Sequence, residues 1–474
     1  MMMNDADQDS IDLTPFNEIL DVIDPFPAKG FISAVMGLKA EATGPKVKVG
    51  TLCTVSDGDK GRLAEVVGFQ DSMVILSPFE DWEGIKQGAE VNFHGAPLLI
   101  RVGDFLLGRV LNGIGEPIDD KGKLPSGHSI TVMNDAPNPV ERPLIDKSIA
   151  TGVRVLDGLC TLGMGQRVGI FSGSGVGKSV LLGMIARNTS ADVNVIALIG
   201  ERGREVREFI ERSLGEEGLK RSVVVVAISN DSPIVRMRGA YVATAIAEYF
   251  RDRGKNVMFM MDSLTRFALA AREVGLVSGE PPATRGYTPS VFTIIPRLVE
   301  RAGRTPKGSI TGIYTVLVEG DDLTEPVSDT ARSVLDGHVI LSRDLADRNH
   351  WPAVDVLRSI SRTMPDVTNE EHMEIAGKLR STLAIYRDAE DLINIGAYKK
   401  GSNKEIDFAI EKIGPINNYL TQGIYERSGY DEALDGLNSI FSDSSSPAEQ
   451  NQGEKKEKPL RKVSTGEAGY TGPL

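Results

Sequence analysis

The sequence has little cysteine and no apolar run long enough to cross a membrane. Its two cysteines, Cys53 and Cys160, lie far apart and lack the close spacing of metal ligands, which excludes a zinc site of paired cysteines and fits a reducing compartment. The longest apolar runs, such as residues 223–228, have the length of one β-strand, whereas a membrane helix needs about 20 apolar residues. The first residues lack the basic start and apolar stretch of a secretory signal, so we expect a cytoplasmic protein.

Acidic residues outnumber basic ones, 66 to 53. The net charge of −13 argues against general nucleic-acid binding, so we expect no nucleic-acid partner. Residues 1–28 contain seven acidic residues and no Lys or Arg. Within this acidic arm, assigned to residues 1–25, four apolar side chains recur at helical spacing: Leu13, Phe16, Leu20 and Ile23. A helix of about ten residues is marginal by itself, so this apolar stripe needs another surface, either on the same chain or on a partner.

The amino-acid composition is that of an ordinary globular protein. One glycine-rich stretch follows an apolar segment of strand length. Residues 168–182 indicate a strand, a turn and a helix. The glycines at positions 173, 175 and 177 let backbone N–H groups close around phosphate oxygens, and the helix directs its positive dipole end at the anion. Lys178 can reach the β- and γ-phosphates of ATP, and the Ser179 hydroxyl is placed to bind Mg²⁺.

The predicted ATP-binding residues of this phosphate loop are Gly173, Ser174, Gly175, Val176, Gly177, Lys178, Ser179 and Val180. Ser172 stands where the strict pattern has glycine, and because it opens the turn we expect it to touch no phosphate. The alternative is a glycine-rich turn without function. A lysine and a serine directly after the glycines, followed by an apolar helix, favour the phosphate loop.

The regions around this loop differ in pattern. Short apolar segments separated by turns between residues 26 and 95 are typical of a small β-barrel. Residues 96–371 alternate strand and helix patterns, with strands expected at 193–199, 223–228, 257–261, 310–318 and 339–341. Residues 372–441 carry apolar side chains at helical intervals. Residues 442–474 contain almost no apolar surface to bury, which predicts a disordered tail.

Acidic residues follow two of the expected strands. Glu201 comes just after residues 193–199, and Asp262 ends the apolar run 256–262. In open parallel sheets, ligands collect at the carboxyl ends of the strands. Glu201 can polarise the water that attacks the γ-phosphorus, and Asp262 can hold Mg²⁺ directly or through its waters. Taken singly, either acid could instead be a helix cap or a surface charge.

Four segments, residues 171–179, 199–209, 285–297 and 359–362, resemble the catalytic subunits of rotary-type ATPases. Within that superfamily the chain resembles the flagellar protein-export ATPases from residue 26 to residue 440. The segment Asn-Ile-Gly-Ala-Tyr-Lys-Lys-Gly-Ser at residues 394–402 favours this branch over the virulence-secretion branch. The resemblance implies an α/β fold: a RecA-like P-loop NTPase core with an N-terminal β-barrel and a C-terminal α-helical domain.

The resemblance also implies an assembly and partners. It implies a homo-hexamer with nucleotide sites between subunits, at the inner face of the cell membrane. Its partners would be a stator-like regulatory protein at the N-terminal arm, a coiled-coil stalk protein, export chaperones and substrates, and the membrane export gate. Such a motor hydrolyses ATP to release export substrates and deliver them to that gate.

The roles of three further residues come from the same resemblance. Arg202 would contact the terminal phosphate, and Arg362 would act as an arginine finger on the nucleotide of a neighbouring subunit. Trp351 occupies the place of an adenine-stacking aromatic residue that is commonly Tyr. The alternatives are a packing role for Trp351 and a salt bridge within one subunit for Arg362.

Other function classes stay open at this stage. A virulence-type secretion ATPase and the catalytic subunit of a proton-driven ATP synthase share nearly all of this chemistry. A hexameric RNA translocase should carry an RNA-binding barrel with exposed aromatic and basic residues. The acidic arm and the weakly basic barrel region count against the RNA translocase.

Overall fold

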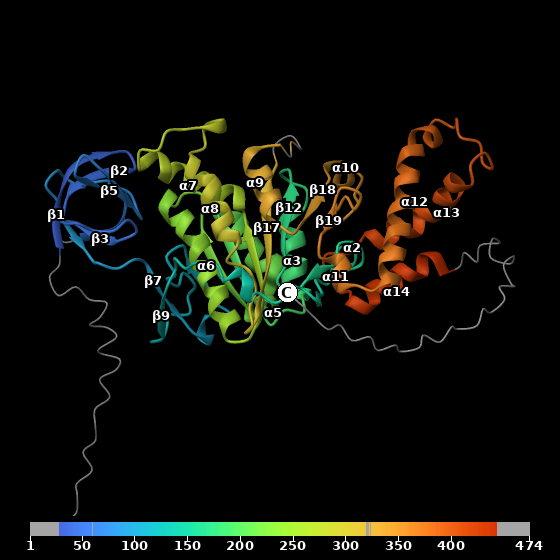
Figure 1. The fold of residues 1–474 in the computed structure, drawn as a ribbon, viewed down its shortest axis with the longest axis horizontal. Helices are drawn as coiled ribbons and strands as arrows, with labels where there is room; N and C mark the ends of the chain where they lie inside the picture. The colour runs from blue at the N-terminus through green and yellow to red at the C-terminus, as the bar shows by residue number, and fades with distance from the viewer. Residues whose placement is uncertain (1–27, 59, 319–321, 323, 443–474) are drawn as a thin grey trace, which may run out of the picture.

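The computed structural model describes residues 28–58, 60–318, 322 and 324–442. A β-barrel, an α/β core and a group of C-terminal helices follow one another along its longest axis (Figure 1). The acidic arm with its apolar stripe, and the tail expected after residue 442, lie outside the described residues. None of the helices within the described ranges is long and apolar enough to cross a membrane.

Six antiparallel strands close the barrel in the order β1-β2-β5-β4-β3-β6. They are β1 (Ala28–Met36), β2 (Lys39–Thr43), β3 (Leu52–Asp57), β4 (Lys60–Gln70), β5 (Met73–Pro78) and β6 (Glu90–Phe93). Side chains alternate across each strand, and the inward set, which includes Ile32, Val55 and Leu76, is buried. The predicted β-barrel is therefore confirmed.

A buried ion pair ties the barrel to the core. Arg238 on helix α6 donates a hydrogen bond from Nε to Oε2 of Glu65 on β4 over 2.8 Å, and the two side chains are 9% and 2% exposed. Loss of either partner would leave a buried charge unpaired, which is costly. The pair therefore favours one orientation of the barrel on the core.

The core is built on a nine-stranded sheet. Its strands run in the order β19 (Ile360–Ser361), β18 (Gly337–Leu341), β12 (Arg167–Ser172), β17 (Ser309–Leu317), β15 (Asn256–Asp262), β13 (Val193–Ile199), β14 (Ser222–Ala227) and β8 (Val110–Asn112), with β16 (Gly303–Arg304) paired to β17. The pairs from β18 to β8 are parallel, and β19 and β16 pair antiparallel. The five expected strands correspond to β13, β14, β15, β17 and β18 within two residues. The sequence patterns did not predict the short edge strands β8 and β19.

Helices cover both faces of this sheet (Figure 1). On one face lie α6 (Pro233–Asp252), α7 (Leu264–Val277), α8 (Pro289–Val299) and α9 (Pro326–Val334); on the other lie α2 (Arg154–Leu159), α3 (Lys178–Asn188) and α5 (Gly215–Lys220). All seven residues of β13 are buried because consecutive side chains face opposite helix layers. Burial on both faces explains the continuous apolar runs of the sequence.

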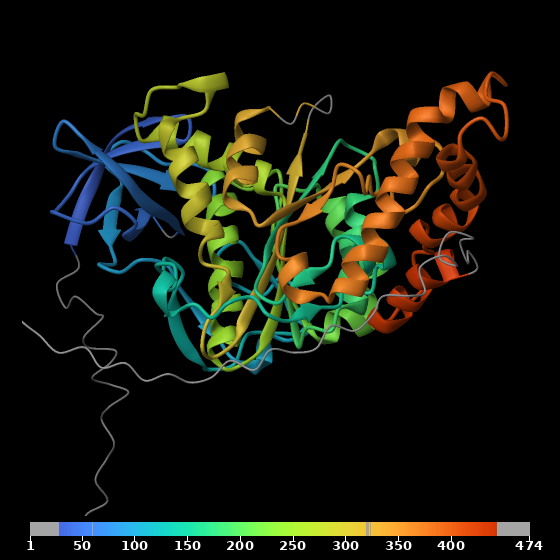
Figure 2. The same cartoon turned by 45° about the vertical axis from the view of Figure 1, so that its right-hand side comes forward.

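The C-terminal helices form a separate group on the α2 side of the core (Figure 2). They are α12 (Glu370–Asn394), α13 (Lys404–Leu420) and α14 (Tyr430–Ser442). Gln422, between α13 and α14, accepts a hydrogen bond at Oε1 from the backbone N–H of Arg154, over 2.8 Å. The predicted C-terminal helical part of the fold is confirmed.

The remaining elements are short. They are β7 (Leu99–Val102), β9 (His128–Thr131), β10 (Ser148–Ile149), β11 (Leu162–Gly163), α4 (Gly203–Glu208), α10 (Arg343–Asp347), α11 (Met364–Val367), a π-helix at Phe209–Leu214, and 3-10 turns at Asp104–Leu106, Pro139–Glu141 and Thr284–Gly286. Strands β7 and β9 pair with each other, as do β10 and β11.

Candidate active site

The phosphate loop lies between the carboxyl end of β12, a buried central strand, and the start of α3. Gly175 and Gly177 adopt φ values of +82° and +84°, a backbone region that glycine enters without strain. The second of these directly precedes α3, which begins at Lys178. The glycines therefore allow the chain to turn sharply and point the first N–H groups of α3 at the loop, as anion binding requires.

A cavity of about 640 Å³ opens over this loop. Its lining includes the predicted residues Gly173, Ser174, Gly175, Gly177, Lys178, Ser179, Val180, Glu201 and Arg202. A volume of this size suits a nucleotide, since small-molecule sites usually measure about 300–1,000 Å³. Val176 does not line the cavity, because its side chain packs in the core with 3% exposed, so only its backbone can serve a ligand.

Lys178 lies between two carboxylates beneath this cavity. Its Nζ is 2.5 Å from Oδ1 of Asp262 and 3.6 Å from Oε1 of Glu201. Burial alone would lower the pKa of Lys178, but Asp262 and then Glu201 outweigh it, so the pKa is raised and the ammonium stays charged. Asp262 is 2% exposed and accepts a further hydrogen bond from Thr315 Oγ1 on β17, over 2.8 Å. Four neighbouring strands, β12, β17, β15 and β13, thus bring these groups together.

Glu201 has the environment of a proton acceptor. Burial first, and the nearby Asp262 carboxylate second, raise its pKa to about 7. The carboxyl of Glu205, on the first turn of α4, accepts a hydrogen bond from Glu201, and that bond lowers the pKa of Glu205. Glu201 Oε1 is buried and has no hydrogen-bond partner among the described residues. A general base works best when its pKa lies near the working pH.

The sequence patterns missed three charged side chains of this cavity: Glu205, Arg266 and Arg343. Arg266 lies on the first turn of α7, four positions after Asp262, and its Nε is buried with no partner among the described residues. Arg343, after β18, donates a hydrogen bond to the carbonyl oxygen of Ser174 over 3.3 Å. The position of Arg266 directly after a strand that ends in an acid is a signal that could have identified it. Arg343 has no such signal.

Trp351 packs against the phosphate loop from outside this cavity. A Cβ atom built on Gly177 would lie 2.8 Å from Cζ3 of Trp351, and the indole Nε1 donates to Asn349 Oδ1 over 3.0 Å. The ring is half-buried. The backbone carbonyl oxygen of Trp351 accepts a hydrogen bond from Gln422 N over 2.8 Å. Trp351 therefore links the phosphate loop to the C-terminal helices.

Arg362 does not enter the cavity of its own chain. It follows the edge strand β19, its side chain is exposed, and only its backbone N–H makes a described hydrogen bond, to Asp336 O over 2.9 Å. Within the described residues its guanidinium forms no ion pair. The salt-bridge alternative therefore has no support in the described part of the chain, and a role for Arg362 would require another subunit.

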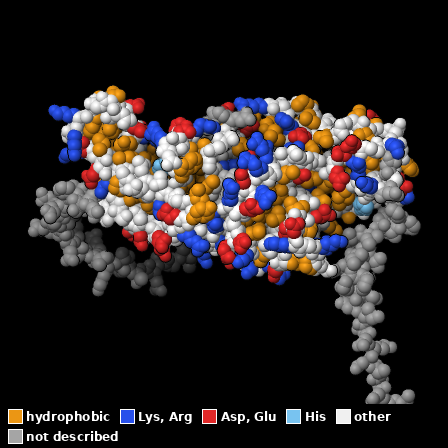
Figure 3. Space-filling view, turned by 180° about the vertical axis from the view of Figure 1, so that it is seen from behind, with side chains coloured by type: hydrophobic (Ala, Val, Ile, Leu, Met, Phe, Trp, Pro, Cys, Tyr) orange, Lys and Arg blue, Asp and Glu red, His pale blue; other side chains and the backbone are white. Residues whose placement is uncertain are grey.

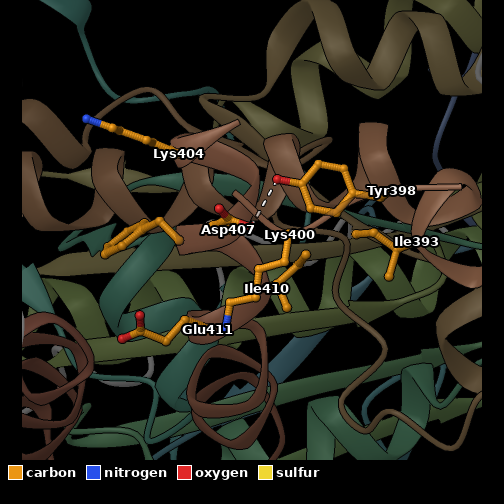
Figure 4. A pocket seen from close by; sticks show the side chains of 8 residues that line it. Ile393, Tyr398, Lys400, Lys404, Asp407, Ile410 and Glu411 are labelled. Atoms are coloured by element: carbon orange, nitrogen blue, oxygen red, sulfur yellow. Dashed lines mark hydrogen bonds between the residues drawn. The ribbon is translucent and has the colours of Figure 1, made fainter. Parts of the chain in front are cut away.

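A second cavity of similar size, about 620 Å³, lies between the end of α12 and α13 (Figure 4). Tyr398 and Lys400 of the segment 394–402 line it together with Lys404 and Asp407, and the Tyr398 hydroxyl donates to Asp407 Oδ1 over 3.0 Å. No phosphate-loop residue lines this cavity. The cavity over the loop is therefore the candidate nucleotide site.

Comparison with known families gives three matches along the chain. Residues 32–95 match the β-barrel domain of the ATP synthase alpha/beta family, and residues 152–361 match the nucleotide-binding domain of the same family. Residues 368–439 match the C-terminal domain of the type III secretion ATPase EscN. The last match distinguishes the chain from ATP synthase subunits, because its C-terminal helices resemble those of secretion ATPases.

Curated relatives are similar over nearly their whole length. The flagellum-specific ATP synthase of Bacillus subtilis is 51% identical over 89% of this chain and 97% of the relative. That of Treponema pallidum is 53% identical over 88% and 94%. The type 3 secretion system ATPase of Xanthomonas euvesicatoria is 50% identical over 87% and 94%.

Solved structures show the same fold. The assembled ATPase EscN of enteropathogenic E. coli superposes with a TM-score of 0.83 at 46% identity and covers 87% of this chain and 99% of that one. EscN in complex with its central stalk EscO gives a TM-score of 0.81 at 45% identity, with the same coverage.

Proposed function

The chain belongs to the family of flagellum-specific ATP synthases and type III secretion ATPases, and we propose that it is the ATP-hydrolysing motor of flagellar protein export. The family establishes the enzyme class, an ATPase. The observation that carries its chemistry is the placement of Lys178 between Asp262 and Glu201 below a cavity of nucleotide size. Export substrates would be released from chaperones and delivered to the membrane gate.

Each residue of the site has a distinct task in this proposal. Lys178 and the loop N–H groups bind the β- and γ-phosphates, and Arg202 and Arg266 neutralise the terminal phosphate. As a carboxylate, Glu201 accepts a proton from the attacking water; in its protonated form it donates a hydrogen bond to the neighbouring Glu205. Trp351 stacks on the adenine, and Arg362 reaches the γ-phosphate of a neighbouring subunit.

The site also fits Mg²⁺. Ser179 supplies a hydroxyl on the first turn of α3, and Asp262 supplies a buried carboxylate at the end of β15. Hard oxygen donors of this kind, with phosphate oxygens completing the set, are what Mg²⁺ prefers. When bound, the ion neutralises charge that develops on the phosphates. Lys178 would then exchange its bond to Asp262 for bonds to the phosphates.

The proposed assembly is a homo-hexamer with a coiled-coil stalk protein, supported by the assembled form and the stalk complex described for EscN. Further proposed partners are a stator-like regulatory protein at the arm of residues 1–25, export chaperones and substrates, and the membrane gate. The proposed location is the cytoplasm, at the inner face of the membrane. Deleting residues 1–24 should abolish binding of the regulatory partner and leave basal ATP hydrolysis intact.

One experiment separates the function classes. Full-length protein is isolated from its cells with bound partners, and the partners are identified. Flagellar export components support the proposal, whereas ATP synthase subunits or virulence-secretion components contradict it.

ATP hydrolysis is also measured with and without RNA, and strong stimulation by RNA would favour an RNA translocase. We expect none, because Lys and Arg side chains are interspersed with Asp and Glu on the face seen in Figure 3.

A further inference from the structure

Another, smaller cavity borders the end of β12 and has no part in the nucleotide chemistry described above. It measures about 50 Å³ and lies at the carboxyl ends of β12 and β18. Its lining includes Ser172, Val318, Arg343, Asp344 and Arg358. Val318 and Arg343 also line the nucleotide cavity, so the two cavities adjoin each other there.

The Ser172 hydroxyl at this cavity lacks a hydrogen-bond partner among the described residues. The residue is 2% exposed. Its carbonyl oxygen, by contrast, accepts a hydrogen bond from Val318 N over 3.0 Å. Buried hydroxyls in native proteins are nearly always paired with protein, water or ligand. Ser172, the residue that departs from the strict loop pattern, therefore has a hydroxyl that needs a hydrogen-bonding partner in this cavity.

The charge at this cavity is positive. Arg343, Arg358 and Asp344, which are all exposed, line the cavity with two positive charges and one negative charge. Neither arginine forms an ion pair with another described residue, and the only described side-chain hydrogen bond of the two is that from Arg343 to Ser174 O. Guanidinium groups bind oxyanions through paired N–H donors. A hydroxyl and two arginines without carboxylate partners form a donor set for a small oxyanion.

From these observations we propose that the cavity is a subsite for the orthophosphate that ATP hydrolysis releases. The inference rests on the ATPase activity proposed above. Phosphate leaving the nucleotide cavity would pass Arg343 and be held by Arg343, Arg358 and the Ser172 hydroxyl. The space is sufficient, because one water occupies roughly 10–15 Å³ by the same measure, and a tetrahedral oxyanion replaces a small cluster of waters. The site retains phosphate without blocking the phosphate loop.

The test uses full-length protein saturated with Mg-ADP, so that the phosphate loop is occupied, and inorganic phosphate as the probe. Equilibrium binding of labelled phosphate is compared among the parental protein, Arg358→Gln, Ser172→Ala and Arg348→Gln. The last variant is the matched control, since Arg348 pairs with Glu390 on the surface and lines neither cavity. ADP affinity is measured for each protein to confirm a folded nucleotide site.

We expect saturable phosphate binding by the parental protein and by Arg348→Gln. In Arg358→Gln it should weaken at least about tenfold, because a hydrogen bond to a charged group is lost. Ser172→Ala should also weaken binding, by a smaller factor.

Unchanged phosphate affinity in both Arg358→Gln and Ser172→Ala would overturn the subsite, as would parental protein that binds no phosphate beside ADP. Failure of the ATPase activity on which the inference rests is distinguishable, because parental protein would then not hydrolyse ATP at all. A crystal structure grown in phosphate gives a direct check. Density for ordered water only, next to Ser172, would also overturn the proposal.

Discussion

Lys178 donates a hydrogen bond from Nζ to Oδ1 of Asp262 over 2.5 Å, so the cation of the phosphate loop is already paired with the acid that ends β15. The two residues lie 84 positions apart in the sequence and meet because β12 and β15 flank β17 in the sheet. Binding of phosphates must therefore break or rearrange this pair.

Lys178→Ala should reduce ATP hydrolysis by roughly a hundredfold or more, because the charge that binds the β- and γ-phosphates is lost. Steady-state hydrolysis measures the effect. The matched control is Lys220→Ala, which removes an equal charge from an exposed position on α5. Comparable hydrolysis by Lys178→Ala and Lys220→Ala would contradict the assignment of the phosphate loop.

Glu201→Gln should bind Mg-ATP with near-parental affinity but hydrolyse it roughly 10²- to 10⁴-fold more slowly, because the amide cannot accept a proton from water. Nucleotide binding and single-turnover hydrolysis are measured separately. Glu208→Gln, on the exposed side of α4, is the control. Parental turnover by Glu201→Gln would show that another group activates the water.

The pH dependence of hydrolysis should report the ionisation of Glu201. Its carboxyl is active as the carboxylate, and its pKa of about 7 lies above the ordinary value, so kcat/KM should rise with pH through about 7 and then level off. In Glu205→Gln the rising limb should move to lower pH, because the acceptor of the Glu201 proton is replaced by an amide that can donate instead. A profile that is flat from pH 6 to 8 would contradict this role.

Arg362→Ala should lose roughly 10³- to 10⁵-fold in rate, the contribution usual for an arginine finger. Mixing Arg362→Ala with Lys178→Ala subunits tests where the finger acts. Each variant is inactive alone, but a mixed ring contains interfaces that pair an intact phosphate loop with an intact finger. Partial recovery of hydrolysis is expected. No recovery at any mixing ratio would place the finger within its own subunit.

Trp351 should report nucleotide binding through its fluorescence. The chain has two tryptophans, and Trp82 is buried in the barrel with 6% exposed, so Trp82→Phe isolates the signal of Trp351. ATP should change the emission of this variant, and Trp351→Ala should bind ATP roughly five- to hundredfold more weakly through loss of stacking. Emission that stays constant at saturating ATP would favour the packing role of Trp351 against Gly177.

Local patterns in the sequence determined the phosphate loop, the central strands and the two acids that follow them. Their signals are short-range: glycines at Gly175 and Gly177 permit positive φ, and a strand buried on both faces must be apolar throughout. The sequence placed Lys178, Glu201 and Asp262 in one predicted site because each follows or ends an expected strand. None of these signals depends on how distant segments meet.

Only the tertiary structure decided which side chains converge. Arg343 reaches Ser174 across 169 positions, and the indole of Trp351 packs on Gly177, because β18 lies beside β12 in the sheet. The same packing turns Val176 into the core and leaves the Ser172 hydroxyl, at a small cavity, without a hydrogen-bond partner in the described part of the chain. Side-chain direction and neighbours across the sheet depend on strand order and register, which no local stretch of sequence encodes.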